Sequence, residues 1–226
     1  MMASGRSIND VPCDPAAIVV RNPPWVSAAC ADARAFARVV AERVRPGQRV
    51  LDLGTGTGIL AIVLAKAGID VAATDISAAA VRTARGNAAR NGVCFDCYRS
   101  DLLKAVEGRF DLIAFNPPYN VRRDTLLANI AKNLLRRIPW VQRNCGRIMP
   151  PAVLRFHQQL VRRIAEEAPP HLTPGGCVML HAYAAEAEAW REVLPAGFSA
   201  AVVEHPALRE FGTVAVVMYP PAGSTG

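Results

Sequence analysis

The stretch Val50-Leu-Asp-Leu-Gly-Thr-Gly-Thr-Gly58 joins a short apolar run to a loop that has a glycine at every second position. The apolar segment Ile59 to Ala67 follows and predicts a buried helix, which Gly68 ends. A strand, a glycine loop and a helix in this order let a cofactor approach the backbone closely beyond the strand end. Because Ile59 stands where a dinucleotide fingerprint requires its third glycine, the pattern disfavours hydride transfer with a nicotinamide cofactor.

Strand and helix patterns alternate on both sides of this unit. Further strands are predicted over Val71–Thr74, Cys94–Tyr98, Phe110–Phe115, Cys177–His181 and Val214–Tyr219. Further helices are predicted over Arg34–Val44, Ser77–Arg90, His157–Ala168 and Glu186–Leu194. Alternation of this kind predicts an α/β fold with a mainly parallel sheet and helices on both faces.

Length and composition favour one domain. The chain has 226 residues, of which 51% are hydrophobic, and this suits a single well-cored α/β domain over residues 1–226. Residues 1–45 are expected to form an N-terminal extension and helix. The segment from Met1 to Asp10 is polar, unlike a signal peptide, and no apolar run reaches the roughly 18 residues of a membrane span. We therefore expect a cytoplasmic protein without membrane association.

Neither the cysteines nor the histidines suggest a metal site. The six cysteines occur singly apart from Cys94-Phe-Asp-Cys97, and no second pair completes a set of zinc ligands. We expect reduced thiols and no bound metal. The histidines show no ligand spacing and are expected to be structural or surface residues: His157, His171, His181 and His205.

Acidic residues stand at the ends of the first three predicted strands. Asp75 follows the glycine loop by about 20 residues, where a carboxylate accepts the two ribose hydroxyls of a nucleoside. Asp101 is placed to meet an adenine amino group, and Asp52 gives a cationic methionine moiety a nearby acceptor. Each residue also has a structural interpretation, since Asp75 and Asp101 could each cap a helix. Together they favour S-adenosylmethionine (SAM) as the cofactor.

The tetrapeptide Asn116-Pro-Pro-Tyr119 follows the apolar strand Phe110–Phe115 directly. Its prolines stiffen the loop and leave carbonyl groups as acceptors, so the Asn116 oxygen and the Pro117 carbonyl can hold both hydrogens of an –NH₂ group. Tyr119 is expected to stack on a flat substrate. The alternative is a Pro118-containing turn that merely ends a strand. A second match, Asn22-Pro-Pro-Trp25, precedes the glycine loop and is interpreted as an extended segment that folds over the site.

With these motifs in place, the chain resembles the HemK-like glutamine N5-methyltransferases of peptide-chain release factors, from about Val44 to Tyr219. The matching segments are residues 50–58, Thr74-Asp-Ile-Ser77, Asp101-Leu-Leu103, Arg109-Phe-Asp-Leu-Ile113, Asn116-Pro-Pro-Tyr119 and Leu172-Thr-Pro-Gly-Gly176. The resemblance implies the seven-stranded, Rossmann-like class I methyltransferase fold with a reversed last strand near Val214–Tyr219. With the strand-end analysis it gives the expected cofactor-binding residues: Asp52, Gly54, Thr55, Gly56, Gly58, Asp75, Ile76, Asp101, Leu102 and Asn116. The expected catalytic residues are Asn116, Pro117, Pro118 and Tyr119.

Two departures from the family leave the methyl acceptor open. We expect the family's N-terminal helical domain to be absent from this chain, with a partner subunit or a second copy of the chain as a candidate replacement. After Tyr119 a basic insert begins, expected over residues 120–157, and the cations up to Arg163 face essentially one acid, Asp124. These cations are Arg122, Arg123, Lys132, Arg136, Arg137, Arg143, Arg147, Arg155, Arg162 and Arg163. They either attract an anionic substrate or form a solvated surface. Trp140 among them either stacks on a flat substrate or base, or makes a core contact.

The leading function is therefore methyl transfer from SAM to a planar amide or amine nitrogen of a small-molecule, peptide or protein substrate. The alternative is methylation of a nucleic-acid base, adenine N6 or guanine N2, for which the net charge of +7 provides electrostatic support. A catalytically silent subunit with the same fold is a third interpretation. Intact glycines and an intact Asn116 argue against it.

Overall fold

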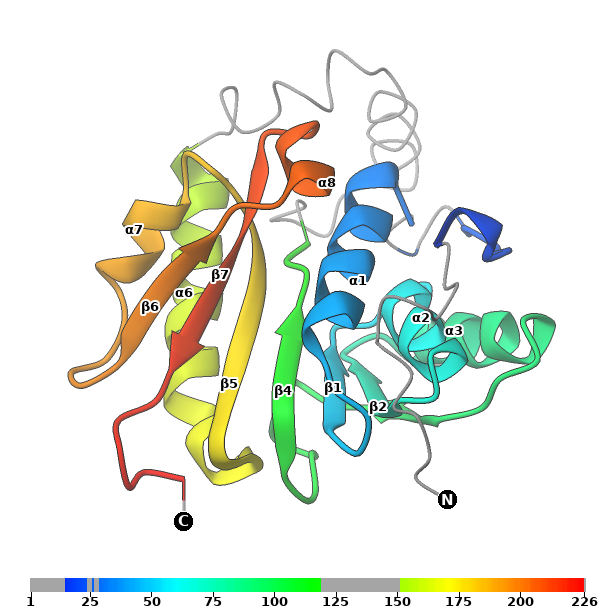
Figure 1. The fold of residues 1–226 in the computed structure, drawn as a ribbon, viewed down its shortest axis with the longest axis horizontal. Helices are drawn as coiled ribbons and strands as arrows, with labels where there is room; N and C mark the ends of the chain where they lie inside the picture. Colours follow the sequence, from blue (N-terminus) through cyan, green and yellow to red (C-terminus); the bar gives the residue numbers. More distant parts are fainter. Residues whose placement is uncertain (1–14, 24–25, 27–28, 119–150, 226) are drawn as a thin grey trace, which may run out of the picture.

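The described part of the computed structural model comprises residues 15–23, 26, 29–118 and 151–225. Its centre is one seven-stranded sheet in the order β3-β2-β1-β4-β5-β7-β6 (Figure 1). The strands are β1 (Arg49–Leu53), β2 (Asp70–Asp75), β3 (Asp96–Arg99), β4 (Phe110–Phe115), β5 (Leu172–Tyr183), β6 (Ser199–Val203) and β7 (Thr213–Tyr219). Strands β1 to β5 pair in parallel, whereas β7 runs antiparallel to both β5 and β6. The expected reversed strand is therefore confirmed.

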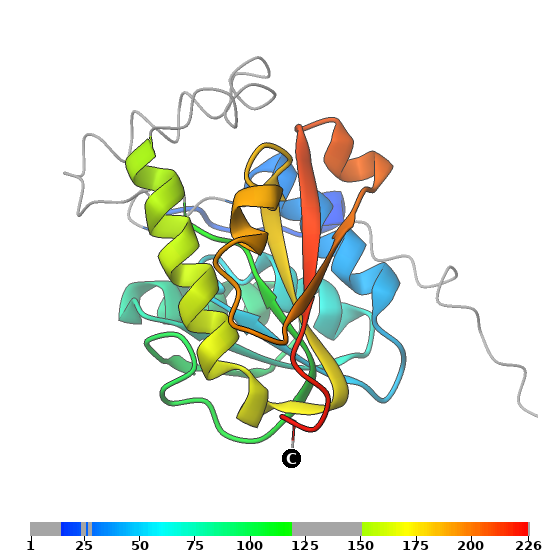
Figure 2. The same cartoon turned by 90° about the vertical axis from the view of Figure 1, so that its left-hand side faces the viewer.

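Helices cover both faces of this sheet, as the alternation predicted (Figure 2). On one face lie α1 (Ala31–Arg43), α2 (Ile59–Lys66), α3 (Ala78–Arg90) and α8 (Pro206–Arg209). On the other face lie α6 (Pro151–Glu167) and α7 (Ala187–Arg191). Two short 3-10 turns, η2 (Pro15–Ala17) and η4 (Pro169–His171), complete the described elements. Among the described residues, no helix is long and apolar enough to cross a membrane.

Each helical layer encloses its own apolar core. The six residues Ile59 to Leu64 of α2 are all buried, because this helix packs against the sheet and against α1 and α3. On the opposite face, α6 buries His157, Val161, Ile164 and Ala165, which recur at helical spacing on one side of the helix. The sheet between the two layers has its central strand β4 almost fully buried. The carboxyl ends of β1, β4 and β5 lie at the upper edge of the sheet in Figure 1. Because the strands behind them are buried, the residues that follow these ends are held in place.

The structure changes several predicted boundaries. Helix α6 begins at Pro151, six residues before the prediction, because proline is accommodated in the first turn of a helix. The basic insert therefore does not extend to residue 157 as a single segment. Strand β5 is longer than predicted, β3 begins at Asp96, and α7 is shorter. The sequence patterns do not predict strand β6, an edge strand whose five residues are all half-buried or exposed.

Candidate active site

The glycine loop after β1 requires glycine for its backbone geometry. Gly54, Gly56 and Gly58 have φ angles of 69°, 56° and 85°, in the left-handed region that side chains disfavour. Thr55 anchors the loop to the neighbouring strand, since its backbone N–H donates to the Thr74 carbonyl at 2.8 Å. The loop is thus held between β1 and β2.

Two of these glycines also allow close packing. A Cβ atom at Gly54 would lie 3.0 Å from the Phe115 ring, at the end of β4. A Cβ atom at Gly58 would lie 3.1 Å from the backbone of Ala84 in α3. The glycine loop therefore directly contacts the strand end that leads into Asn116.

Asp75 ends β2 with its carboxylate against the glycine loop. One oxygen accepts a hydrogen bond from the Gly56 N–H at 2.9 Å, and the other accepts from the Ser77 N–H at 2.8 Å. Each oxygen keeps a second lone pair, so the carboxylate can still receive two hydroxyl donors. Burial raises the pKa of Asp75, although both backbone hydrogen bonds favour its charged form. Ile76 beside it is 60% exposed.

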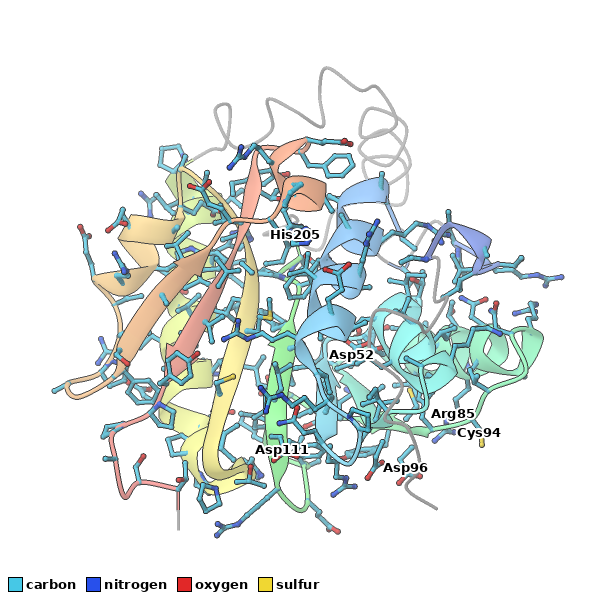
Figure 3. All side chains as sticks on the ribbon, in the orientation of Figure 1. Asp52, Arg85, Cys94, Asp96, Asp111 and His205 are labelled. Carbon is cyan, nitrogen blue, oxygen red and sulfur yellow. The ribbon has the colours of Figure 1, made fainter. Side chains whose placement is uncertain are left out.

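Asp52 lies inside the molecule, near the centre of the view in Figure 3. Its Oδ2 accepts hydrogen bonds from the Thr55 hydroxyl at 2.6 Å and from the Ala61 N–H at 3.1 Å. Burial raises its pKa to about 7 despite these donors. Asp52 therefore connects the glycine loop to the first turn of α2, and its expected role at the methionine end stays a prediction.

Asp101 occupies the turn after β3 and is ion-paired at the surface. Its carboxylate contacts the Lys104 ammonium at 2.6 Å and the Arg163 guanidinium at 3.4 Å, and the Lys104 hydrogen bond is the main reason that the pKa of Asp101 is lowered. Leu102 next to it has a φ of 49°, and its carbonyl accepts from the Ser100 hydroxyl at 2.6 Å. A left-handed conformation is uncommon for a non-glycine residue, so this turn is a candidate functional turn. The contact of this turn with adenine stays a prediction.

Asn116, Pro117 and Pro118 follow β4 immediately, at the edge occupied by the glycine loop. The Asn116 Oδ1 lies 3.0 Å from Nδ1 of His181 in β5, and the Pro118 carbonyl lies 3.0 Å from Nε2 of His157 in α6. No described residue donates to the Pro117 carbonyl. Tyr119 lies outside the described residues, so its stacking role is not tested.

The structure gives two of the four histidines a place beside this loop that the sequence reasoning missed. His157 and His181 are both fully buried. His157 also contacts a carboxylate, with Nδ1 2.8 Å from Oε1 of Glu186. The signal in the sequence was its position four and seven residues before Val161 and Ile164, on the apolar face of a helix. His205, by contrast, pairs with Glu42 at 3.0 Å near α8, as expected of a surface residue (Figure 3).

The N-terminal segment lies against α3 beside the glycine loop. The Asn87 side chain binds both backbone groups of Arg21, at 2.9 and 3.1 Å, and donates to the Thr57 carbonyl at 2.9 Å. In the second Asn-Pro-Pro match, the Asn22 oxygen accepts from the Ala29 N–H at 2.9 Å. The Asn22 side chain therefore binds the backbone of its own N-terminal segment. Trp25 lies outside the described residues.

Part of the basic cluster is neutralised. Arg162 pairs with Glu166 at 2.9 Å and Arg163 with Glu167 at 3.0 Å, one helical turn along α6. Asp124 is the one acid between Asn120 and Arg163, but the two arginines find acidic partners just beyond Arg163. Arg155 is exposed on the same helix. The seven cations from Arg122 to Arg147, and Trp140, lie outside the described residues.

Comparison with known proteins places this site in a family. The chain belongs to the methyltransferase small domain family, whose model matches residues 31–150. The release factor glutamine methyltransferase of Bordetella pertussis is 38% identical over 154 residues, which are 66% of this chain and 53% of that protein. The ribosomal RNA small subunit methyltransferase C of Alcanivorax borkumensis is 31% identical over 136 residues, 60% of this chain and 32% of that protein. The HemK-like resemblance is thus supported. The match spans about half the length of the first relative, and a smaller share of the second.

A solved structure of a methyltransferase from Pyrococcus furiosus has the same fold, with a TM-score of 0.61 and 20% sequence identity. The match covers 89% of this chain and 88% of that chain. The seven-stranded Rossmann-like methyltransferase fold expected from the sequence is therefore confirmed.

Proposed function

We propose that the protein transfers a methyl group from SAM to a planar amide or amine nitrogen of a small-molecule, peptide or protein substrate. The observation that carries this proposal is the Asn116-Pro117-Pro118 loop at the end of β4, next to the glycine loop. Among acceptors, a glutamine side-chain amide fits best, because the release factor glutamine methyltransferase is the relative with 38% identity.

The residues beyond β1 and β2 fit the cofactor. The left-handed glycines give a backbone that a ligand can approach, and Asp75 has a lone pair available on each oxygen for the ribose hydroxyls. The exposed Ile76 offers an apolar surface for the adenine ring. When bound, SAM supplies an electrophilic methyl group on a sulfonium.

The Asn116 loop orients the acceptor. An amide oxygen has two lone pairs, so Asn116 can accept from His181 and from a substrate N–H at once. The Pro117 carbonyl supplies a second acceptor for the same –NH₂ group. Fixing both hydrogens would direct the nitrogen lone pair toward the methyl group and would stabilise the positive charge that develops on nitrogen. No strong base is needed for that step.

Methylation of a nucleic-acid base is the second candidate. It is favoured by the relative that is named a ribosomal RNA methyltransferase, and by the net charge of +7. A small or peptide acceptor that is anionic would use the same cations. A partner subunit or a second copy of the chain would complete substrate recognition in either case, and a cytoplasmic location belongs to the same proposal.

Methyl transfer to two purified acceptors tests the proposal. The protein is incubated with [methyl-¹³C]SAM and either a peptide-chain release factor or small-subunit ribosomal RNA. Labelled N5-methylglutamine in the release factor is the expected product, whereas a labelled base in the RNA would establish the alternative. Binding of SAM without transfer to either acceptor would favour the silent subunit.

A further inference from the structure

We infer that His157 and His181 are positioning residues that hold the acceptor-binding loop at two separate points; the inference rests on the proposed function. His181 comes from β5 and His157 from α6, so the two contacts approach the loop from different elements. Nothing in the local sequence around Asn116 specifies them.

His181 holds the Asn116 side chain. With the Asn116 amide in this orientation, Nδ1 faces an oxygen that can only accept, so Nδ1 carries the proton and donates at 3.0 Å. If the Asn116 amide were flipped, its NH₂ group would face this N–H donor, and the hydrogen bond would be lost. The imidazole is fully buried and stacks on the Phe36 ring, with centroids 5.0 Å apart and planes at 20°. Packing therefore fixes the imidazole ring, and its Nδ1–H tautomer is the one that matches this orientation of the asparagine.

His157 holds the main chain two residues further on. The Pro118 carbonyl can only accept, so Nε2 of His157 carries a proton and donates at 3.0 Å. Nδ1 on the other side of the ring lies 2.8 Å from Oε1 of Glu186, and Oε2 of that carboxylate accepts from the Tyr183 N–H at 3.3 Å. Trp190 packs edge-on against the imidazole. The chain Tyr183–Glu186–His157–Pro118 thus connects the end of β5 to the loop.

Together the contacts leave the intervening acceptor group available. His181 fixes the loop at residue 116 and His157 fixes it at residue 118, while no described residue donates to the Pro117 carbonyl between them. Both ends of a two-acceptor cradle are then held without using the carbonyl that would bind substrate. Such preorganisation matters because a displacement of about 1 Å of a positioning group can cost roughly 10²-fold in rate.

Matched substitutions separate this role from simple core packing. His181→Phe keeps a ring against Phe36 but removes the donor, whereas His181→Asn places an amide N–H near the position of Nδ1. His157→Leu and His157→Gln form the corresponding pair, because a glutamine amide reaches the position of Nε2. His205→Phe, at the distant Glu42 ion pair, is the control. For each variant, kcat and KM are measured with [methyl-¹³C]SAM and the release factor, and affinity for S-adenosylhomocysteine by calorimetry.

We expect His181→Phe and His157→Leu to lower kcat about 10- to 100-fold while KM and the cofactor affinity change less than about threefold. His181→Asn and His157→Gln should each recover most of the lost kcat, and the control should match the parent. Equal losses in both members of a pair, or a loss that appears only in cofactor affinity, would overturn the inference.

A second measurement is independent of turnover. In ¹⁵N-histidine-labelled parent protein, long-range ¹H–¹⁵N spectra should show a proton on Nδ1 of His181 and on Nε2 of His157. Asn116→Ala should shift the His181 proton and leave that of His157 in place. An unprotonated Nδ1 in His181 would contradict the positioning role whatever the substrate is. Protonation as expected, in a protein that methylates neither acceptor, would count against the release factor and the RNA as acceptors and would leave the positioning role standing.

Discussion

The carboxylate of Asp75, at the end of β2, accepts a hydrogen bond from the Gly56 N–H in the loop after β1, at 2.9 Å. This contact brings the expected ribose acceptor onto the expected cofactor loop. Asp75→Ala should therefore weaken binding of S-adenosylhomocysteine about 10- to 100-fold, since it removes charge-assisted hydrogen bonds to the ribose. Isothermal titration calorimetry measures this affinity directly.

Asp70→Ala is the matched control for that experiment. Asp70 is the first residue of the same strand, at the other end from Asp75. Its side chain is 69% exposed and forms an ion pair with Arg49. Its loss should leave cofactor affinity unchanged within about twofold. If the two alanine variants bind equally well, Asp75 is not the ribose acceptor.

Asn116→Ala tests the acceptor-binding loop. The variant should keep most of its affinity for S-adenosylhomocysteine and lose about 10²-fold or more in kcat, because Asn116 acts mainly on the acceptor and on charge that develops in the transition state. Single-turnover methyl transfer with saturating SAM measures the chemical step. A variant that keeps most of its activity would show that another group orients the nitrogen.

Gly58→Ala tests the close packing of the cofactor loop against α3. Alanine at a φ of 85° costs about 1–2 kcal/mol, and its Cβ would also meet the Ala84 backbone at 3.1 Å. Gly68→Ala has a comparable φ of 76° with no atom within 4 Å, so it measures the backbone cost alone. Urea unfolding should show Gly58→Ala to be the less stable of the two by roughly 1 kcal/mol or more. Equal stabilities would mean that the loop and α3 separate easily.

The raised pKa of Asp52 should make the free energy of unfolding depend on pH. Burial raises its pKa from 3.8 to about 7, so the folded protein retains a proton that the unfolded chain releases. The stabilising effect of that proton is fully present below about pH 4, declines as the pH rises, and is gone above about pH 7. The total is at most about 4 kcal/mol for a shift of this size. The parent should therefore lose stability relative to Asp52→Asn between about pH 4 and about pH 7, as measured by denaturant unfolding of the cofactor-free proteins. Parallel pH profiles for the two proteins would contradict the raised pKa.

The parts of the site that could be predicted from the sequence are those built from neighbouring residues. The glycine loop, the acid at the end of β2 and the asparagine at the end of β4 each follow from the order of strand, loop and helix residues within one short segment. Their assembly at one edge follows from the parallel pairing of β1, β2 and β4.

The remaining contacts join residues that are far apart in the sequence, so no short sequence pattern predicts them. His157 and Pro118 are 39 residues apart, and His181 and Asn116 are 65 apart. The ion pair of Asp101 with Arg163 joins the turn after β3 to α6 in the same way. A histidine on the buried face of a helix indicates a partner in the core, but the fold alone decides that this partner is the loop beyond β4.

Methyl transfer itself tests the central claim most directly. With [methyl-¹³C]SAM and a peptide-chain release factor, mass spectrometry of the digested product should show one labelled methyl group on a glutamine side-chain nitrogen, and the Asn116→Ala protein should give at most about a hundredth of that rate. Absence of any labelled nitrogen in the release factor or in small-subunit ribosomal RNA, from a parent protein that calorimetry shows to bind SAM, would contradict the claim.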